Sequence, residues 1–160
     1  MGVLEDLGKK IDDRTARIGI IGLGYVGLPL AVELARAGFK VTGFEIAAQK
    51  VRSIEAGISY IGDVPTADLR AMRDAGRLHA TVDFDELRDI HVVNIAVPTP
   101  LTRTKDPDVS YMARAVEQIR DRLRPGQLII LGSTTYPGTT HELFVPLLEL
   151  AGTPVVLNVD

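Results

Sequence analysis

The 160-residue sequence contains no cysteine and no tryptophan, and aromatic residues make up only 5% of it. Without cysteine the chain can form no disulfide, no zinc–thiolate site and no thiolate nucleophile of its own. It also has no apolar run approaching the length of about 18 residues that a membrane-spanning helix needs, and its first residues lack the apolar core of a signal peptide. These absences predict a cytoplasmic protein with no membrane partner.

A strong excess of one charge is also missing. The formal net charge is −3 and the pI is about 5.6, so the composition does not favour nucleic acid as a partner. The three histidines are scattered, without the spacing of metal ligands, and we therefore predict no metal site. The acidic run at residues 83–89 is expected to be a solvated surface.

Apolar runs alternate with helical patterns along the chain, which is typical of βαβ units in an α/β protein with a parallel sheet. We expect strands at residues 17–22, 40–46, 79–82, 90–97, 127–131 and 155–157. Helices are expected at residues 25–37, 47–56, 64–76, 110–123 and 141–150, with Ser110 as the N-cap of the fourth. Residues 1–15 are expected to form a helical N-terminal extension, and residues 16–160 one domain.

A glycine-rich turn stands between the first strand and the first helix of this domain. In the G-x-G-x-x-G pattern, Gly22 permits the tight turn, Gly24 lets a pyrophosphate approach the backbone, and Gly27 lets the helix pack on the strand. Tyr25 and Val26 are expected to offer backbone N–H groups to the anion. The motif predicts a Rossmann-type doubly wound sheet of six parallel strands, order 3-2-1-4-5-6, within three α/β/α layers.

The end of the second strand offers an independent check on the cofactor. Glu45 follows Gly22 by 23 residues, close to the spacing of about 20 at which an acidic residue accepts the adenosine ribose hydroxyls. Its carboxylate would repel a 2′-phosphate, and no arginine immediately follows, so the pattern favours NAD over NADP. Lys50 could reach the edge of the ribose, or it could simply lie on an exposed helix face.

Two further loops follow the fourth and fifth strands. Because ligands of open α/β sheets bind at the carboxyl ends of the strands, Val97, Thr99, Ser133 and Thr134 are candidate cofactor contacts. The threonine hydroxyls could donate to phosphate or ribose oxygens, whereas turn chemistry is their alternative role. Composition and spacing indicate no set of residues arranged for catalysis.

Three segments together resemble the UDP-glucose/GDP-mannose dehydrogenase family: Gly22–Ala31, Val97–Leu101 and Ser133–Thr139. The extended loop from Pro98 to Tyr111 and the segment Ser59–Asp63 look most like the branch that acts on UDP-N-acetylhexosamines. The resemblance runs from about residue 17 to residue 159. It implies the N-terminal NAD-binding domain of an enzyme that oxidises the C6 alcohol of a nucleotide sugar to a carboxylate, using two NAD.

The same resemblance implies what this chain does not contain. Family members carry a central dimerising helix and a UDP-sugar-binding domain, which hold the nucleophilic cysteine and the sugar contacts, and full-length members are expected to be homo-oligomers. The resemblance links Thr134 to orienting a water or a substrate oxygen, which makes it an auxiliary residue at most. We therefore expect this chain alone to bind NAD and to oxidise nothing.

Two positions depart from the family pattern. Glu45 stands where members usually carry aspartate, and Gly132 stands where the nearest branch usually carries glutamate. Two other interpretations stay open at this point: the cofactor domain of a β-hydroxyacid-type dehydrogenase, and a free-standing dinucleotide-binding or sensing module.

Overall fold

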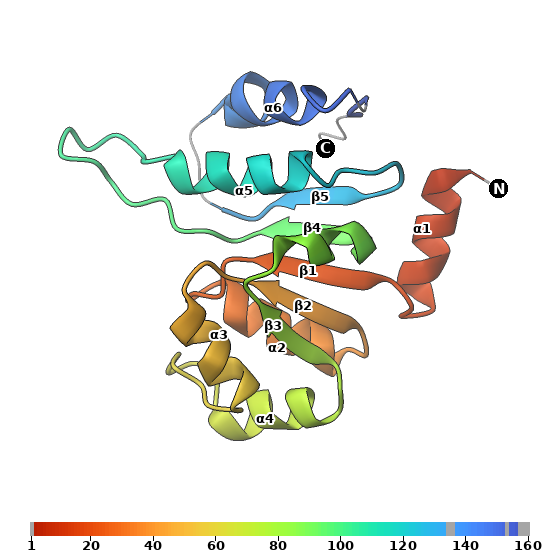
Figure 1. Cartoon of the computed structure of the whole chain (residues 1–160), viewed down its shortest axis with the longest axis vertical. Helices are drawn as coiled ribbons and strands as arrows, with labels where there is room; N and C mark the ends of the chain where they lie inside the picture. Colours follow the sequence, from red (N-terminus) through yellow and green to blue (C-terminus); the bar gives the residue numbers. More distant parts are fainter. Residues whose placement is uncertain (1, 134–136, 153, 157–160) are drawn as a thin grey trace.

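The computed structural model describes residues 2–133, 137–152 and 154–156. Five parallel strands form one sheet in the order β3-β2-β1-β4-β5, so the chain order reverses between β1 and β4 (Figure 1). Their bounds are β1 Arg17–Ile21, β2 Lys40–Phe44, β3 Leu78–Thr81, β4 Val92–Ile95 and β5 Leu128–Leu131. This is the doubly wound topology that the sequence predicts, matched strand for strand as far as β5.

The sixth strand, expected at residues 155–157, is not seen. Val155 and Val156 lie outside the sheet, and Leu157 lies outside the described residues. The three-residue run Val155–Leu157 has apolar side chains but no regular pattern long enough to fix a strand. The sheet of the described residues therefore has five strands, and β5 forms its edge.

The helices lie on both faces of the sheet, with α2, α3 and α4 on one side and α5 and α6 on the other (Figure 1). Helix α1 lies beside the ends at which the strands begin. The helical bounds are α1 Val3–Asp12, α2 Gly27–Arg36, α3 Ala48–Glu55, α4 Thr66–Asp74, the 3₁₀ helix η1 Phe84–Asp89, α5 Ser110–Arg120, the π-helical turn η2 Thr140–Phe144 and α6 Val145–Glu149. Every helix expected from the sequence is present, with ends that differ by at most three residues.

The start of α5 differs from the prediction in one respect. Ser110 is its first residue rather than its cap, and the side chain of Asp108 accepts the Ser110 N–H at 2.9 Å. Hydrogen bonds from the Ser110 side chain and backbone hold the pKa of Asp108 below its ordinary value. The carboxylate thus satisfies one of the free N–H groups with which every helix begins.

Two apolar clusters fill the spaces between the layers. The first joins β1–β3 to α2, α3 and α4, and the second joins the other face and β4 to α5 and α6. Continuous β-branched strands such as Arg17–Ile21, in which four of the five residues are buried, are what a sheet covered on both faces requires. The pyrophosphate turn leaves β1, the strand between these two clusters.

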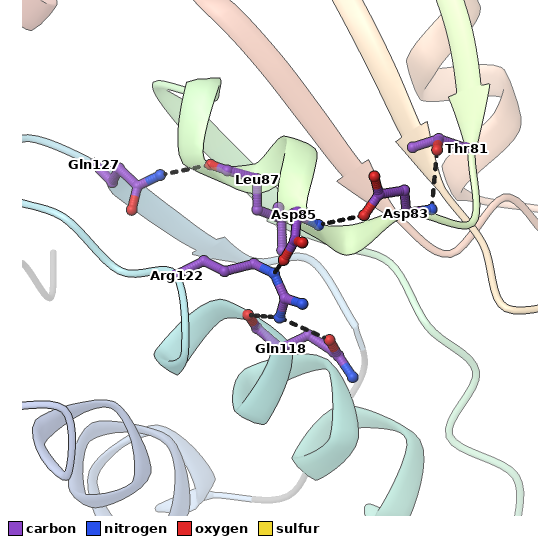
Figure 2. Close-up of polar contacts among 7 residues, drawn as sticks. All are labelled: Thr81, Asp83, Asp85, Leu87, Gln118, Arg122 and Gln127. Carbon is purple, nitrogen blue, oxygen red and sulfur yellow. Dashed lines mark hydrogen bonds and ion pairs between the residues drawn. The ribbon is translucent and has the colours of Figure 1, made fainter.

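Polar contacts fix the connection from β3 to β4, which crosses the sheet (Figure 2). The Asp83 side chain accepts the N–H of Asp85 at 3.0 Å and so caps η1. Arg122, just past α5, donates to the Asp85 carboxylate at 2.8 Å, and Gln127 donates to the backbone oxygen of Leu87 at 3.0 Å. The acidic run is thus solvated as expected, but one of its members also ties the crossover to the second half of the domain.

The loop after β4 forms a projecting finger, residues 98–109, beyond the carboxyl ends of the strands (Figure 1). Leu101 and Pro107 form an antiparallel bridge at its base. At its tip, Thr104 donates to the Asp106 carboxylate at 2.7 Å, and the Asp106 N–H donates to the Thr102 hydroxyl at 3.2 Å. The finger is thus held mainly by its own hydrogen bonds.

Replacing Phe44 tests the packing between the sheet and η1. Its side chain is fully buried, with its ring centroid 5.6 Å from that of Phe84. Phe44→Ala should lower the free energy of unfolding by about 3–5 kcal/mol, because a cavity remains in a close-packed core. Urea unfolding measures it, with the exposed Leu4→Ala as the control, which should change it by less than about 0.5 kcal/mol. Equal losses in both variants would contradict this packing.

His91 gives stability a dependence on pH. Its Nδ1 accepts the N–H of Arg17 at 2.9 Å, which requires a neutral ring. Burial, and then Lys10, Arg124 and Arg17, lower its pKa below 6.5, against a smaller opposing effect of Asp6. Because the unfolded chain then binds this proton more readily, the stabilisation is complete above the unfolded pKa of about 6.5 and is lost as the pH falls below it through the lower pKa of the folded chain.

His91→Asn keeps an acceptor at this position but does not titrate. Between about pH 7.5 and about pH 5, the wild type should lose more free energy of unfolding than the variant. Urea unfolding across that range measures the difference. Parallel stability curves for the two proteins would show that His91 does not contribute.

Candidate functional site

The turn after β1 brings three backbone segments so close together that side chains would not fit. Gly22 has a φ of +93°, and a Cβ there would lie 2.7 Å from the backbone oxygen of Ala96. A Cβ on Gly27 would overlap the carbonyl oxygen of Gly22. These two glycines therefore allow α2 to begin directly above the end of β1, as the motif predicts.

The first turn of α2 leaves a row of free N–H groups. Those of Gly24, Tyr25, Val26 and Gly27 donate to no other described residue, whereas that of Leu28 donates to the Gly24 oxygen. Tyr25 and Val26 are 81% and 61% exposed, and no atom lies within 4 Å of a Cβ built on Gly24. Free donors at a helix N-terminus, next to open space, form a site for an anion such as a pyrophosphate.

Glu45 lies one residue past β2, and its carboxylate is buried against the same turn. Oε2 accepts the Leu23 N–H at 3.1 Å, and Oε1 accepts those of Ile46 and Ala47 at 2.9 and 3.2 Å. These bonds fill three of the roughly four acceptor positions of a carboxylate. In this conformation Glu45 can accept one ribose hydroxyl rather than the two that the sequence suggests, and it also braces the turn.

Lys50 and Tyr60 also lie close to Glu45 and to the turn that it contacts. Lys50 Nζ lies 3.9 Å from Glu45 Oε2 and 5.8 Å from the ring centroid of Tyr60. The hydroxyl of Tyr60 donates to the Leu23 carbonyl at 2.6 Å. The sequence places Lys50 near the ribose edge but assigns nothing to Tyr60, because its contact spans 37 residues. Its position in the Ser59–Asp63 segment was the only available signal.

The loops after β4 and β5 meet at the carboxyl edge of the sheet. Ser133 Oγ donates to the backbone oxygens of Val97 at 2.9 Å and Ile95 at 3.3 Å, so it joins the two loops. Thr99 is partly buried, and its hydroxyl bonds to no described residue, which leaves it available to a ligand. Thr134 lies outside the described residues. The structure thus brings Val97 and Ser133 together.

Neither a metal centre nor a membrane segment is found in the part of the chain that the structure describes. No group of three or more His, Cys, Asp and Glu side chains there could hold a metal ion. No helix of these residues has the length and apolar character to cross a bilayer.

A doubly wound parallel sheet, a glycine turn with free N–H groups and an acidic residue at the end of β2 together define a dinucleotide-binding domain of the Rossmann type. Residues 16–159 match the family model described as "UDP-glucose/GDP-mannose dehydrogenase family, NAD binding domain". The chain belongs to this family and forms its NAD-binding domain. Its cofactor is therefore NAD.

Curated relatives agree with this assignment. The chain is 38% identical over 133 residues to the UDP-N-acetyl-D-glucosamine 6-dehydrogenase of Pseudomonas aeruginosa, covering 83% of this chain and 31% of that protein. It is 36% identical over 138 residues to the UDP-N-acetyl-D-mannosamine dehydrogenase of Pyrococcus horikoshii, covering 85% and 32%. The chain thus spans about a third of the length of these relatives.

Solved structures show the same fold. A GDP-mannose dehydrogenase from Pseudomonas aeruginosa aligns with a TM-score of 0.80 at 34% identity, covering 84% of this chain and 32% of that one. The NDP-N-acetyl-D-galactosaminuronic acid dehydrogenase of Methanosarcina mazei aligns with a TM-score of 0.84 at 32% identity, covering 97% and 35%. A (S)-3-hydroxybutyryl-CoA dehydrogenase from Ralstonia eutropha, at 18% identity and a TM-score of 0.58, shares the fold alone.

Glu45→Gln tests whether the carboxylate braces the turn. The amide has one acceptor oxygen, so its NH₂ group must face either the Leu23 N–H or those of Ile46 and Ala47. We expect the free energy of unfolding to fall by about 1–3 kcal/mol and NAD affinity to fall with it. The control is Glu33→Gln, since the Glu33 side chain is 66% exposed and, among the described residues, pairs with Arg36 alone, at 3.6 Å. Identical urea unfolding of both variants would exclude the bracing role.

Proposed function

We propose that this chain acts within an NAD-dependent nucleotide-sugar 6-dehydrogenase, an enzyme that oxidises the C6 alcohol of a UDP-sugar to a carboxylate. The observation that carries the proposal is the set of free N–H groups at Gly24–Gly27 beside the buried carboxylate of Glu45. The printed functions of the relatives supply the reaction, with UDP-N-acetylhexosamines as the favoured substrates. A role in polysaccharide biosynthesis, a cytoplasmic location and a homo-oligomeric full-length enzyme remain predictions.

The residues present fit the cofactor. The open space at Gly24 and the free N–H groups around it would hold the pyrophosphate, and Glu45 would accept a hydroxyl of the adenosine ribose. Lys50 would lie at the rim of the ribose site. Thr99 and Val97 would border the nicotinamide half, together with Thr134. When bound, NAD supplies the hydride acceptor of the oxidation.

The 160 residues do not contain everything that the oxidation needs. The family resemblance implies a cysteine thiolate that attacks the aldehyde intermediate, and this chain has no cysteine. We therefore propose that the chain holds the oxidant and that residues outside it hold the sugar.

Calorimetric titration with NAD and NADP tests the cofactor assignment directly. The buried carboxylate of Glu45 should repel a 2′-phosphate, so NAD should bind at least about tenfold more tightly than NADP, a difference of about 1.4 kcal/mol. The same sample should form no NADH when a UDP-sugar and NAD are added. Tighter binding of NADP, or binding of neither dinucleotide, would refute the proposal.

A further inference from the structure

Leu23, between the first two glycines of the turn, has both of its backbone polar groups bonded to side chains. Its N–H donates to Glu45 Oε2 at 3.1 Å, and its carbonyl accepts from the Tyr60 hydroxyl at 2.6 Å. Glu45 follows β2, whereas Tyr60 lies in the loop between α3 and α4. Two elements distant in sequence therefore hold one residue of the pyrophosphate turn.

The hydrogen bond from Tyr60 to the Leu23 carbonyl also fixes the direction of the Gly24 N–H. The Leu23 carbonyl and the Gly24 N–H belong to the same peptide unit, and in a planar trans peptide these two groups point in opposite directions. The described chain contains no cis peptide. With the Leu23 oxygen held toward Tyr60, the Gly24 N–H must point away from it, and this N–H has no partner among the described residues.

We propose that Tyr60 is a positioning residue for the cofactor: through the Leu23–Gly24 peptide it aims the Gly24 N–H at the pyrophosphate. The bond also strengthens that donor, because hydrogen bonds to the two ends of one peptide unit polarise each other. This inference rests on the proposed cofactor site and adds a residue to it. Tyr60 itself needs no contact with NAD.

The hydroxyl of Tyr60 is well placed for this role. The Ser59 N–H donates to the Thr66 hydroxyl at 3.1 Å, and the Ser59 hydroxyl donates to the Ile61 oxygen at 3.0 Å, so the loop is tied to the start of α4. Burial, and secondarily the charge of Glu45, raise the pKa of Tyr60 well above its ordinary value. The group therefore keeps the proton that it donates.

Lys50 helps to hold both Tyr60 and Glu45 in place. Its ammonium group lies 5.8 Å from the centroid of the Tyr60 ring and 3.9 Å from Glu45 Oε2. A cation over an aromatic face is attracted by the ring, and the same cation attracts the carboxylate. Lys50 thus connects the two side chains that hold Leu23.

Tyr60→Phe removes only the hydroxyl and keeps the ring. In ¹⁵N-labelled protein without ligand, the Gly24 amide proton should shift upfield, because its peptide loses the polarising bond. By calorimetry, NAD and ADP-ribose should bind about 5- to 20-fold more weakly, as expected for one lost hydrogen bond in a partly buried site. The affinity for adenosine, which has no phosphate, should stay unchanged.

The matched control is Tyr111→Phe, since the Tyr111 hydroxyl has no partner among the described residues. It should leave the Gly24 amide shift and the affinities for NAD, ADP-ribose and adenosine unchanged. An unshifted Gly24 amide in Tyr60→Phe, an unchanged NAD affinity, or an equal loss for adenosine and NAD would each overturn the role of Tyr60. If the wild type itself binds no NAD, the proposed cofactor function fails instead, and the ligand-free Gly24 shift still reports on the Tyr60 contact.

Discussion

The contact between the Gly22 carbonyl and the first turn of α2 at Gly27 is the constraint on which the site depends. Because no side chain separates them, the helix starts directly above β1, and its unpaired N–H groups lie at the carboxyl edge of the sheet. Gly22 also packs directly against the backbone just past β4, since a Cβ on Gly22 would lie 2.7 Å from the Ala96 oxygen. The turn is thus fixed against both halves of the domain at once.

A second close approach explains why Glu45 can reach this turn. A Cβ on Gly43 of β2 would lie 2.6 Å from Leu23 Cδ1, so the Leu23 side chain fits only because residue 43 is a glycine. Leu23 is 1% exposed, and with its side chain packed against β2 its N–H donates to Glu45 Oε2 at 3.1 Å. Packing in the apolar core therefore sets the polar geometry above it, and the longer glutamate side chain spans the remaining distance.

The sequence predicts the parts of this site that depend on local patterns but not the contacts that depend on how the chain folds back on itself. The strands, helices and glycine turn follow from local patterns, so Gly22, Gly27 and the order of five strands could be read in advance. The contact of Tyr60 with Leu23 depends on how a loop folds back across 37 residues, which no local pattern records. The start of α5 is a separate case, because the Asp108 carboxylate accepts the Ser110 N–H only two residues away, a local contact that the expected N-cap role of Ser110 does not include. The expected sixth strand rests on an apolar run too short to determine strand pairing.

The β1–β2 side and the β4–β5 side of the site differ in how firmly the domain holds their polar groups. On the β1–β2 side, Leu23 and Glu45 have their polar groups bonded within the domain, and the strands beneath are buried. On the β4–β5 side, the Thr99 hydroxyl bonds to no described residue, the finger is held mainly by its own hydrogen bonds, and Leu128 of β5 is 40% exposed. Backbone donors that the fold holds in one direction lose little entropy when they bind, whereas a side-chain hydroxyl that can rotate must be ordered. The part of the site that we propose for the adenosine and pyrophosphate is therefore preorganised by this fold, whereas the part that we propose for the nicotinamide is less rigidly held.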